Sequence, residues 1–196
     1  LPTGLVRPGV RSTGERHGGF ERPELGVGQL APRPRGEAPV GDGPDASADQ
    51  PGDRVAAWMP NTVETVVAML GAAAVGAVFS SCSPDFGSDG VLDRFGQIEP
   101  TVLIAADGYT YGSKEFDRRA ELARIVGAMA GLRQLVVVPF LADAPDLAPL
   151  AGADTAVSTW EDWLAPHTGA TPRYEQLPFD HPWYVLFSSG TTGVPK

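Results

Sequence analysis

The chain has 196 residues, 42% of them hydrophobic, which is enough for one globular domain but too few for a large two-domain enzyme. Its 15 basic and 24 acidic residues give a net charge of −9, which argues against a nucleic-acid partner. The single cysteine, Cys82, can form neither an internal disulfide nor a metal cluster, so we expect a reduced, cytoplasmic protein without a metal site. No basic leader and no run of about 18 apolar residues is visible, so we expect no membrane partner.

Residues 1–50 differ in composition from the rest of the chain. They contain ten glycines and seven prolines, and Phe20 is their only aromatic residue. Such a segment buries too little apolar surface to offset the chain entropy lost on folding, so we expect it to be disordered or irregular. At Pro51 the composition changes abruptly, and this position is our predicted boundary.

The first predicted unit is a strand at 54–59, stopped by Pro60, followed by a helix that begins near Thr62 with Asn61 as its N-cap. A second strand at 77–81 leads to a helix at 90–97, which ends before Pro100. These two strand–helix pairs occupy the first part of the predicted domain.

A third strand at 102–106 is closed by a turn at 107–108, and a helix at 116–129 carries its apolar residues on one face. A fourth strand follows at 135–138. Residues 141–181 are looser, with one short amphipathic piece at 159–164, and a final strand at 183–187 runs into a glycine-rich loop. Strands separated by helices of about ten residues predict an α/β fold built from βαβ units with a mostly parallel sheet.

The loop after the final strand carries the chemistry of phosphate binding. Its hydroxyls, glycines and lysine are Ser188, Ser189, Gly190, Thr191, Thr192, Gly193 and Lys196. Glycines let backbone N–H groups approach a polyphosphate, hydroxyls donate further hydrogen bonds, and lysine adds a compact positive charge. The spacing is not that of a Walker A loop. A solvent-exposed Ser/Gly turn without function is the alternative for this pattern alone.

The complete string from Ser188 to Lys196 resembles the phosphate loop of the adenylate-forming superfamily, which includes acyl-CoA synthetases, firefly-type luciferases and peptide-synthetase adenylation domains. Further strings are similar to acetoacetyl-CoA synthetases (acetoacetate-CoA ligases) within it, and they lie at 51–61, 77–87, 91–100, 107–114 and 181–187. The resemblance covers 51–196 and is weakest between 142 and 173. It identifies 51–196 as an incomplete amino-terminal domain of an AMP-dependent synthetase.

The resemblance implies that a short-chain carboxylate, here acetoacetate, attacks the α-phosphate of ATP to give an acyl-adenylate and pyrophosphate. Coenzyme A then displaces AMP to form the thioester. The loop would hold the β and γ phosphates, with Mg²⁺ as a companion charge. Another short-chain acyl-CoA synthetase, of acetyl or propionyl type, and a non-catalytic nucleotide-binding fragment are the alternatives.

The other motifs of the family are expected after Lys196, so we expect no catalytic residue within this stretch and no activity from it alone. Residues 1–50 do not resemble the family. We hypothesise that they are a frame-shifted translation or a mispredicted start, with a natural disordered arm as the alternative.

Five further positions receive interpretations from the sequence. Cys82 at a strand end is expected to be a small buried hydrophobic residue rather than a nucleophile. Asp85 and Phe86 follow a proline and are expected in a turn, with a substrate or coenzyme role as the alternative. Arg94 is expected on a solvated helix face, with an approach to a coenzyme phosphate as the alternative, and His181 is assigned no catalytic role.

Overall fold

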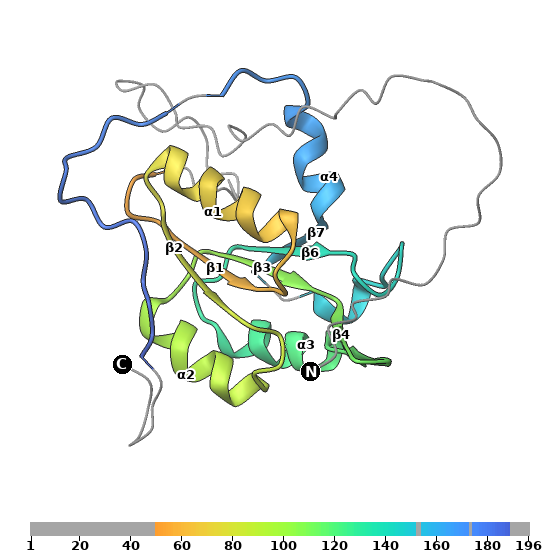
Figure 1. The fold of residues 1–196 in the computed structure, drawn as a ribbon. Coiled ribbons are helices and arrows are strands. Elements are labelled where there is room, and N and C mark those ends of the chain that lie inside the picture. The colour runs from red at the N-terminus through yellow and green to blue at the C-terminus, as the bar shows by residue number, and fades with distance from the viewer. Residues whose placement is uncertain (1–49, 152–153, 173, 189–196) are drawn as a thin grey trace, which may run out of the picture.

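The computed structural model describes residues 50–151, 154–172 and 174–188, so the predicted low-order segment lies almost wholly outside the described residues. Its centre is a five-stranded parallel sheet in the order β2-β1-β3-β6-β7. Helices α1 and α4 cover one face of this sheet, and α2 and α3 cover the other (Figure 1). This three-layer arrangement confirms the predicted α/β fold class.

The elements have the following bounds. The sheet contains β1 (Arg54–Trp58), β2 (Val78–Cys82), β3 (Val102–Ala106), β6 (Gln134–Val138) and β7 (Ala156–Thr159), and a separate antiparallel hairpin contains β4 (Gly108–Tyr111) and β5 (Lys114–Asp117). The helices are α1 (Val63–Val75), α2 (Ser88–Ile98), α3 (Arg119–Ala128) and α4 (Trp160–Leu164), with short 3₁₀ turns at Ala148–Leu150 and Ala165–His167.

The central strands are continuous apolar runs because both of their faces are buried. In β1, Val55 and Ala57 belong to the core cluster beneath α1, whereas Ala56 and Trp58 belong to the cluster beneath α2 and α3. Every residue of β3 and β6 is at most 4% exposed. Helices must therefore cover both sides of the sheet, and the alternation along β1 assigns its side chains to the two layers.

The predicted start of α1 is displaced by one residue. Thr62, not Asn61, is the N-cap, and its side chain makes no capping hydrogen bond. The hydroxyl of Thr65 instead donates to the carbonyl oxygen of Pro60 at 2.7 Å, which ties the first turn of the helix to the end of the preceding strand. The prediction of Asn61 as the N-cap is therefore wrong, because the chain leaving Pro60 enters the helix one residue later.

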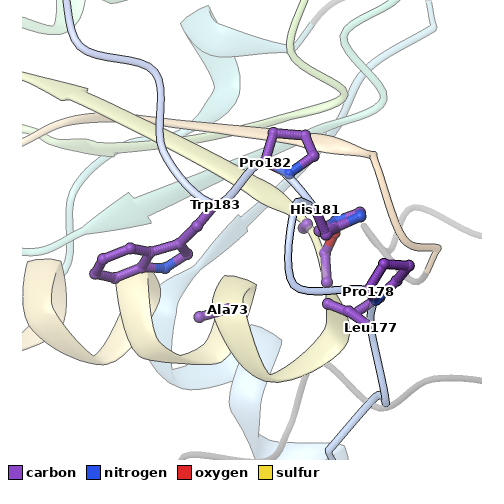
Figure 2. A pocket seen from close by; sticks show the side chains of 8 residues that line it. Ala73, Leu177, Pro178, His181, Pro182 and Trp183 are labelled. Atoms are coloured by element: carbon purple, nitrogen blue, oxygen red, sulfur yellow. The ribbon is translucent and has the colours of Figure 1, made fainter.

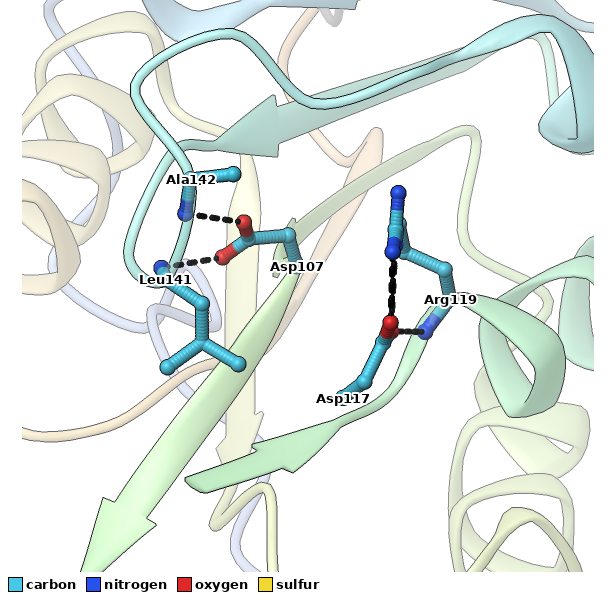
Figure 3. A network of polar contacts seen from close by, with 5 residues as sticks. All are labelled: Asp107, Asp117, Arg119, Leu141 and Ala142. Atoms are coloured by element: carbon cyan, nitrogen blue, oxygen red, sulfur yellow. Dashed lines mark hydrogen bonds and ion pairs between the residues drawn. The ribbon is translucent and has the colours of Figure 1, made fainter.

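The predicted helix at 116–129 is wrong at its start, where the structure has a hairpin. Phe116 lies in β5, and its ring stacks on Tyr109 of β4 with 5.0 Å between centroids. The carboxylate of Asp117 then accepts the backbone N–H of Arg119 at 2.9 Å, and α3 begins there. The guanidinium of Arg119 also donates to this carboxylate and holds the pKa of Asp117 below its usual value (Figure 3).

Two strand predictions also need correction. β7 was missed, because an edge strand of four residues with two hydroxyl side chains gives a weak apolar signal. The predicted strand at 183–187 contributes only a single parallel bridge, between Tyr184 and Phe79 of β2. The predicted strands near 54, 77, 102 and 135 are confirmed, and α2 is two residues longer at its start than predicted.

The carboxylate of Asp107 fixes the loop that follows β6. This side chain stands just after β3, is 2% exposed, and accepts the backbone N–H groups of Phe140, Leu141 and Ala142 at 2.8, 2.9 and 3.0 Å. Figure 3 shows the carboxylate pointing into this loop. Three charge-assisted hydrogen bonds satisfy the buried charge and join the ends of two neighbouring strands.

We expect Asp107→Asn to lower the free energy of unfolding by about 1–3 kcal/mol, because one oxygen becomes an amide donor and leaves a buried N–H without an acceptor. Urea denaturation of the chain measures this change. Asp117→Asn is the matched control, since Asp117 is exposed and the Oδ1 of asparagine can still accept the Arg119 N–H. Equal losses in the two variants would contradict the role assigned to Asp107.

Candidate functional site

The segment that leads to the glycine-rich loop wraps around the carboxyl end of α1. The backbone N–H of Glu175 donates to the carbonyl of Ala74 at 2.8 Å. Helix α1 ends at Gly76, whose φ of +77° suits glycine, and a Cβ there would lie 3.0 Å from the side chain of Leu177. Gly76 therefore allows both the sharp end of α1 and the close approach of this segment.

His181 holds the same segment against Gly76. Its Nε2 lies 2.8 Å from the Gly76 carbonyl oxygen, and because a carbonyl only accepts, Nε2 carries the proton. The contact gives His181 an anchoring role on this segment.

The chain then runs alongside β2, which is an edge strand of the sheet. The N–H of Phe79 donates to the carbonyl of Trp183 at 3.0 Å, and the N–H of Val185 donates to the carbonyl of Phe79 at 2.9 Å. The pairing is parallel, so the segment travels toward the carboxyl ends of the strands. Ligands of open α/β sheets bind beyond those ends.

Two serines of β2 add side-chain contacts to this pairing. The hydroxyl of Ser80, which is fully buried, donates to the carbonyl oxygen of Val185 at 2.9 Å. The hydroxyl of Ser81 lies 2.6 Å from the hydroxyl of Tyr184. The Tyr184 ring packs edge-on against Phe79 in the core beneath α1.

Of the predicted phosphate-binding residues, the structure describes Ser188, which is exposed and follows this segment. The other six lie outside the described residues, namely Ser189, Gly190, Thr191, Thr192, Gly193 and Lys196. The structure therefore describes the segment that leads to the loop and the first residue of the loop.

A cavity of about 290 Å³ lies between α1 and the segment 177–183. Figure 2 shows Trp183 above α1, with His181, Pro178 and Leu177 around the opening. The lining is mainly apolar and reaches Ala77, just before β2 begins. The cavity is thus at the amino end of β2, whereas the glycine-rich loop follows a segment that runs toward the carboxyl end.

Cys82, at the end of β2, is partly buried and packs against the core beneath α2 and α3. Burial raises the pKa of its thiol to about 12, an effect that Asp85 reinforces and Arg94 opposes. This environment agrees with the structural interpretation of Cys82, because a thiolate is the reactive form of cysteine.

The turn after β2 forms as predicted, since the N–H of Phe86 donates to the carbonyl of Ser83 at 3.2 Å. Arg94 does not extend into solvent from α2. Its guanidinium lies over the Phe86 ring, 4.2 Å from the centroid, and donates to the carbonyl of Gly90 at 2.7 Å. The expected solvated position of Arg94 is therefore corrected to a half-buried one.

Within the described ranges, no group of three or more His, Cys, Asp or Glu side chains is placed to hold a metal ion. No helix in the part of the chain that the structure describes has the length and apolar character to cross a bilayer.

The family model described as AMP-binding enzyme matches residues 48–196, which include the sheet, both helical layers and the glycine-rich loop. This chain belongs to the AMP-binding enzyme family. The match begins close to the compositional boundary at Pro51.

Named relatives agree with this assignment. An acetoacetyl-coenzyme A synthetase of Rhizobium meliloti (strain 1021) is 48% identical over 145 residues, and one of Mus musculus is 42% identical over 148 residues. Each match covers 74% of this chain and 22% of the relative. The solved acetoacetyl-CoA synthetase of Streptomyces lividans is 48% identical with a TM-score of 0.65, over 76% of this chain and 21% of that one. The resemblance to acetoacetyl-CoA synthetases is confirmed, and the chain spans about a fifth of the length of these relatives.

Ser80, Ser81 and Tyr184, which hold the segment before the loop against β2, were not predicted from the sequence. One signal was present, because two consecutive hydroxyl residues stand within a strand whose other residues are apolar. Their partners lie more than a hundred positions away, at Tyr184 and Val185, and no local pattern links the two segments.

We expect Cys82 in the folded chain to react with iodoacetamide at pH 8 at least about tenfold more slowly than in urea, because burial disfavours the thiolate. Its rate should continue to rise with pH beyond 9.0, toward the raised pKa of about 12. Mass spectrometry of the alkylated peptide follows both rates. A plateau near pH 9 in the folded chain would show that Cys82 is not buried as described.

Proposed function

We propose that this chain is part of an ATP-dependent acid-thiol ligase that activates acetoacetate as an acyl-adenylate and transfers it to coenzyme A. The observation that carries the proposal is the path of residues 183–185, which run parallel to β2 toward the carboxyl edge of the sheet. The glycine-rich loop follows these residues directly in the sequence. The names of the relatives supply the substrate, since all those cited act on acetoacetate by name.

The donor set of the loop fits a nucleotide polyphosphate. Ser188, Ser189, Thr191 and Thr192 would donate hydroxyl hydrogen bonds, and Gly190 and Gly193 would leave backbone N–H groups accessible. Lys196 would balance the charge that develops on the departing pyrophosphate. These residues bind and orient, which lowers the barrier without any covalent step on the protein.

Magnesium, when bound with ATP, would neutralise part of the phosphate charge. We assign it no protein ligand among the described residues. Coenzyme A would enter as the second substrate and would not need a protein thiolate, in agreement with the raised pKa of Cys82.

The domain boundary forms part of the proposal. Residues 51–196 are assigned to the amino-terminal domain of the synthetase, and residues 1–50 to a segment outside it. The hydrogen bond from the N–H of Gly52 to the carbonyl of Gly76 ties the start of the domain to the end of α1, and it supports a boundary at this position.

A chimera tests the proposed activity. Residues 51–196 replace the matching segment of the Streptomyces lividans synthetase, and pyrophosphate release from ATP is followed with acetoacetate, acetate or propionate. We expect release with acetoacetate to exceed release with the other two acids, and the 196-residue chain alone to release none above background. A preference for acetate or propionate would favour the corresponding synthetase type, and a chimera that folds without adenylating any acid would reject the proposal.

Lys196→Ala in the same chimera tests the assigned role of the loop. Removal of a charge-assisted hydrogen bond is expected to lower kcat/KM for ATP by about 10- to 100-fold. Lys114→Ala is the matched control, because Lys114 is the chain's other lysine and is exposed on the hairpin. Equal activities of the two variants would remove Lys196 from the phosphate site.

A further inference from the structure

We propose that Ser80, Ser81 and Tyr184 are positioning residues that fix where the phosphate loop begins. The proposal rests on the function proposed above for that loop. It concerns residues that do not themselves contact the nucleotide and that act through the main chain.

The contact of Ser80 lies where the pairing of the two segments stops. In a regular parallel ladder, the N–H of Ser81 would be the next donor after the bond from Val185 to Phe79, and the carbonyl of Val185 would be its acceptor. Among the hydrogen bonds of the described residues, that carbonyl accepts from the Ser80 hydroxyl instead. Leu186 is then 81% exposed, so the chain leaves the sheet immediately after Val185.

The contact of Ser81 secures the opposite face of the same segment. Consecutive side chains of a strand point to opposite faces, so Ser80 and Ser81 contact the segment from opposite faces of the sheet. The Tyr184 ring lies 5.5 Å from the Phe79 ring at an angle of 63°, and its hydroxyl reaches Ser81 at 2.6 Å. The main chain at 184–185 is thus held by a backbone bridge and by one hydroxyl contact on each face.

The distance from this anchor to the loop is short. Ser188 is three positions after Val185, and three extended residues span at most about 10 Å. A displacement of the Val185 carbonyl would therefore also displace the start of the phosphate loop. Because small misplacements of positioning groups are costly in catalysis, the anchor should matter for the step in which pyrophosphate leaves.

Measuring the two half-reactions separately distinguishes a positioning role of these residues from a general effect on protein stability. The loop is needed while pyrophosphate departs, but in the second step pyrophosphate is already gone. Loss of the anchor should therefore lower the rate of adenylation and spare thioester formation from a supplied acyl-adenylate. A purely structural loss would lower both steps together.

The test uses the chimera defined above, with Ser80→Ala, Ser81→Ala and Tyr184→Phe. The Tyr184→Phe variant keeps the ring and removes only the hydroxyl. We expect each to lower kcat/KM for ATP in adenylation by about tenfold, the loss of one hydrogen bond, while thioester formation changes less than about twofold. Ser81→Thr keeps a hydroxyl and should restore adenylation, and Ser83→Ala is the control, since Ser83 is exposed just beyond β2.

Hydrogen exchange of the 196-residue chain provides a second measurement that does not depend on activity. Amides of 183–187 should exchange faster in Tyr184→Phe and Ser80→Ala than in Ser83→Ala. Unchanged exchange, or equal loss of both half-reactions, would overturn the positioning role. A parent chimera without adenylation would reject the proposed function and, with it, the link to catalysis, whereas the exchange rates would still decide whether these residues anchor the segment.

Discussion

Burial of both faces of the central strands is the constraint on which the rest of this structure depends. β1, β3 and β6 have no face that tolerates water, so helices must lie above and below them, and the connections must cross from one strand end to the next. This requirement sets the three layers and brings the carboxyl ends of all five strands to one edge. The buried carboxylate of Asp107 lies at that edge, just after β3, and accepts hydrogen bonds from backbone N–H groups of the loop that follows β6.

The edge strand β2 has a different role, because one of its sides is open to further pairing. The late segment of the chain uses that side. It is held first at Gly76, by the packing of Leu177 and the hydrogen bond of His181, and then along β2 by a single backbone bridge. After this bridge, hydrogen bonds to the hydroxyl groups of Ser80 and Ser81 take the place of further backbone pairing. Within the described residues, the chain is therefore held at Tyr184 and Val185 and forms no further strand pairing with β2 beyond them. In the function proposed above, these contacts would set where the phosphate loop begins.

The sequence predicted the strands near 54, 77, 102 and 135 well because each is an apolar run bounded by Pro, Gly or Asp. The predictions failed where pairing decides the conformation. Phe116 fits the apolar face of a helix as well as it fits a strand, and only its stacking on Tyr109 across the hairpin selects the strand. The run at 183–187 has strand composition, but the Ser80 hydroxyl takes the carbonyl that the ladder would need. The short polar strand β7 forms because β6 offers it an edge.

The sequence by itself determined the fold class, the family resemblance and the chemical character of the glycine-rich loop, and it predicts a boundary near Pro51. Each of these depends on composition or on residues that are neighbours in the chain. Only the tertiary structure decided how residues 184–185 are held against β2, since Ser80 and Ser81 meet Val185 and Tyr184 across more than a hundred residues. It also decided that Arg94 lies over Phe86 and that His181 donates to Gly76. Such contacts arise when burial brings distant segments together, and local sequence patterns contain no information about that proximity.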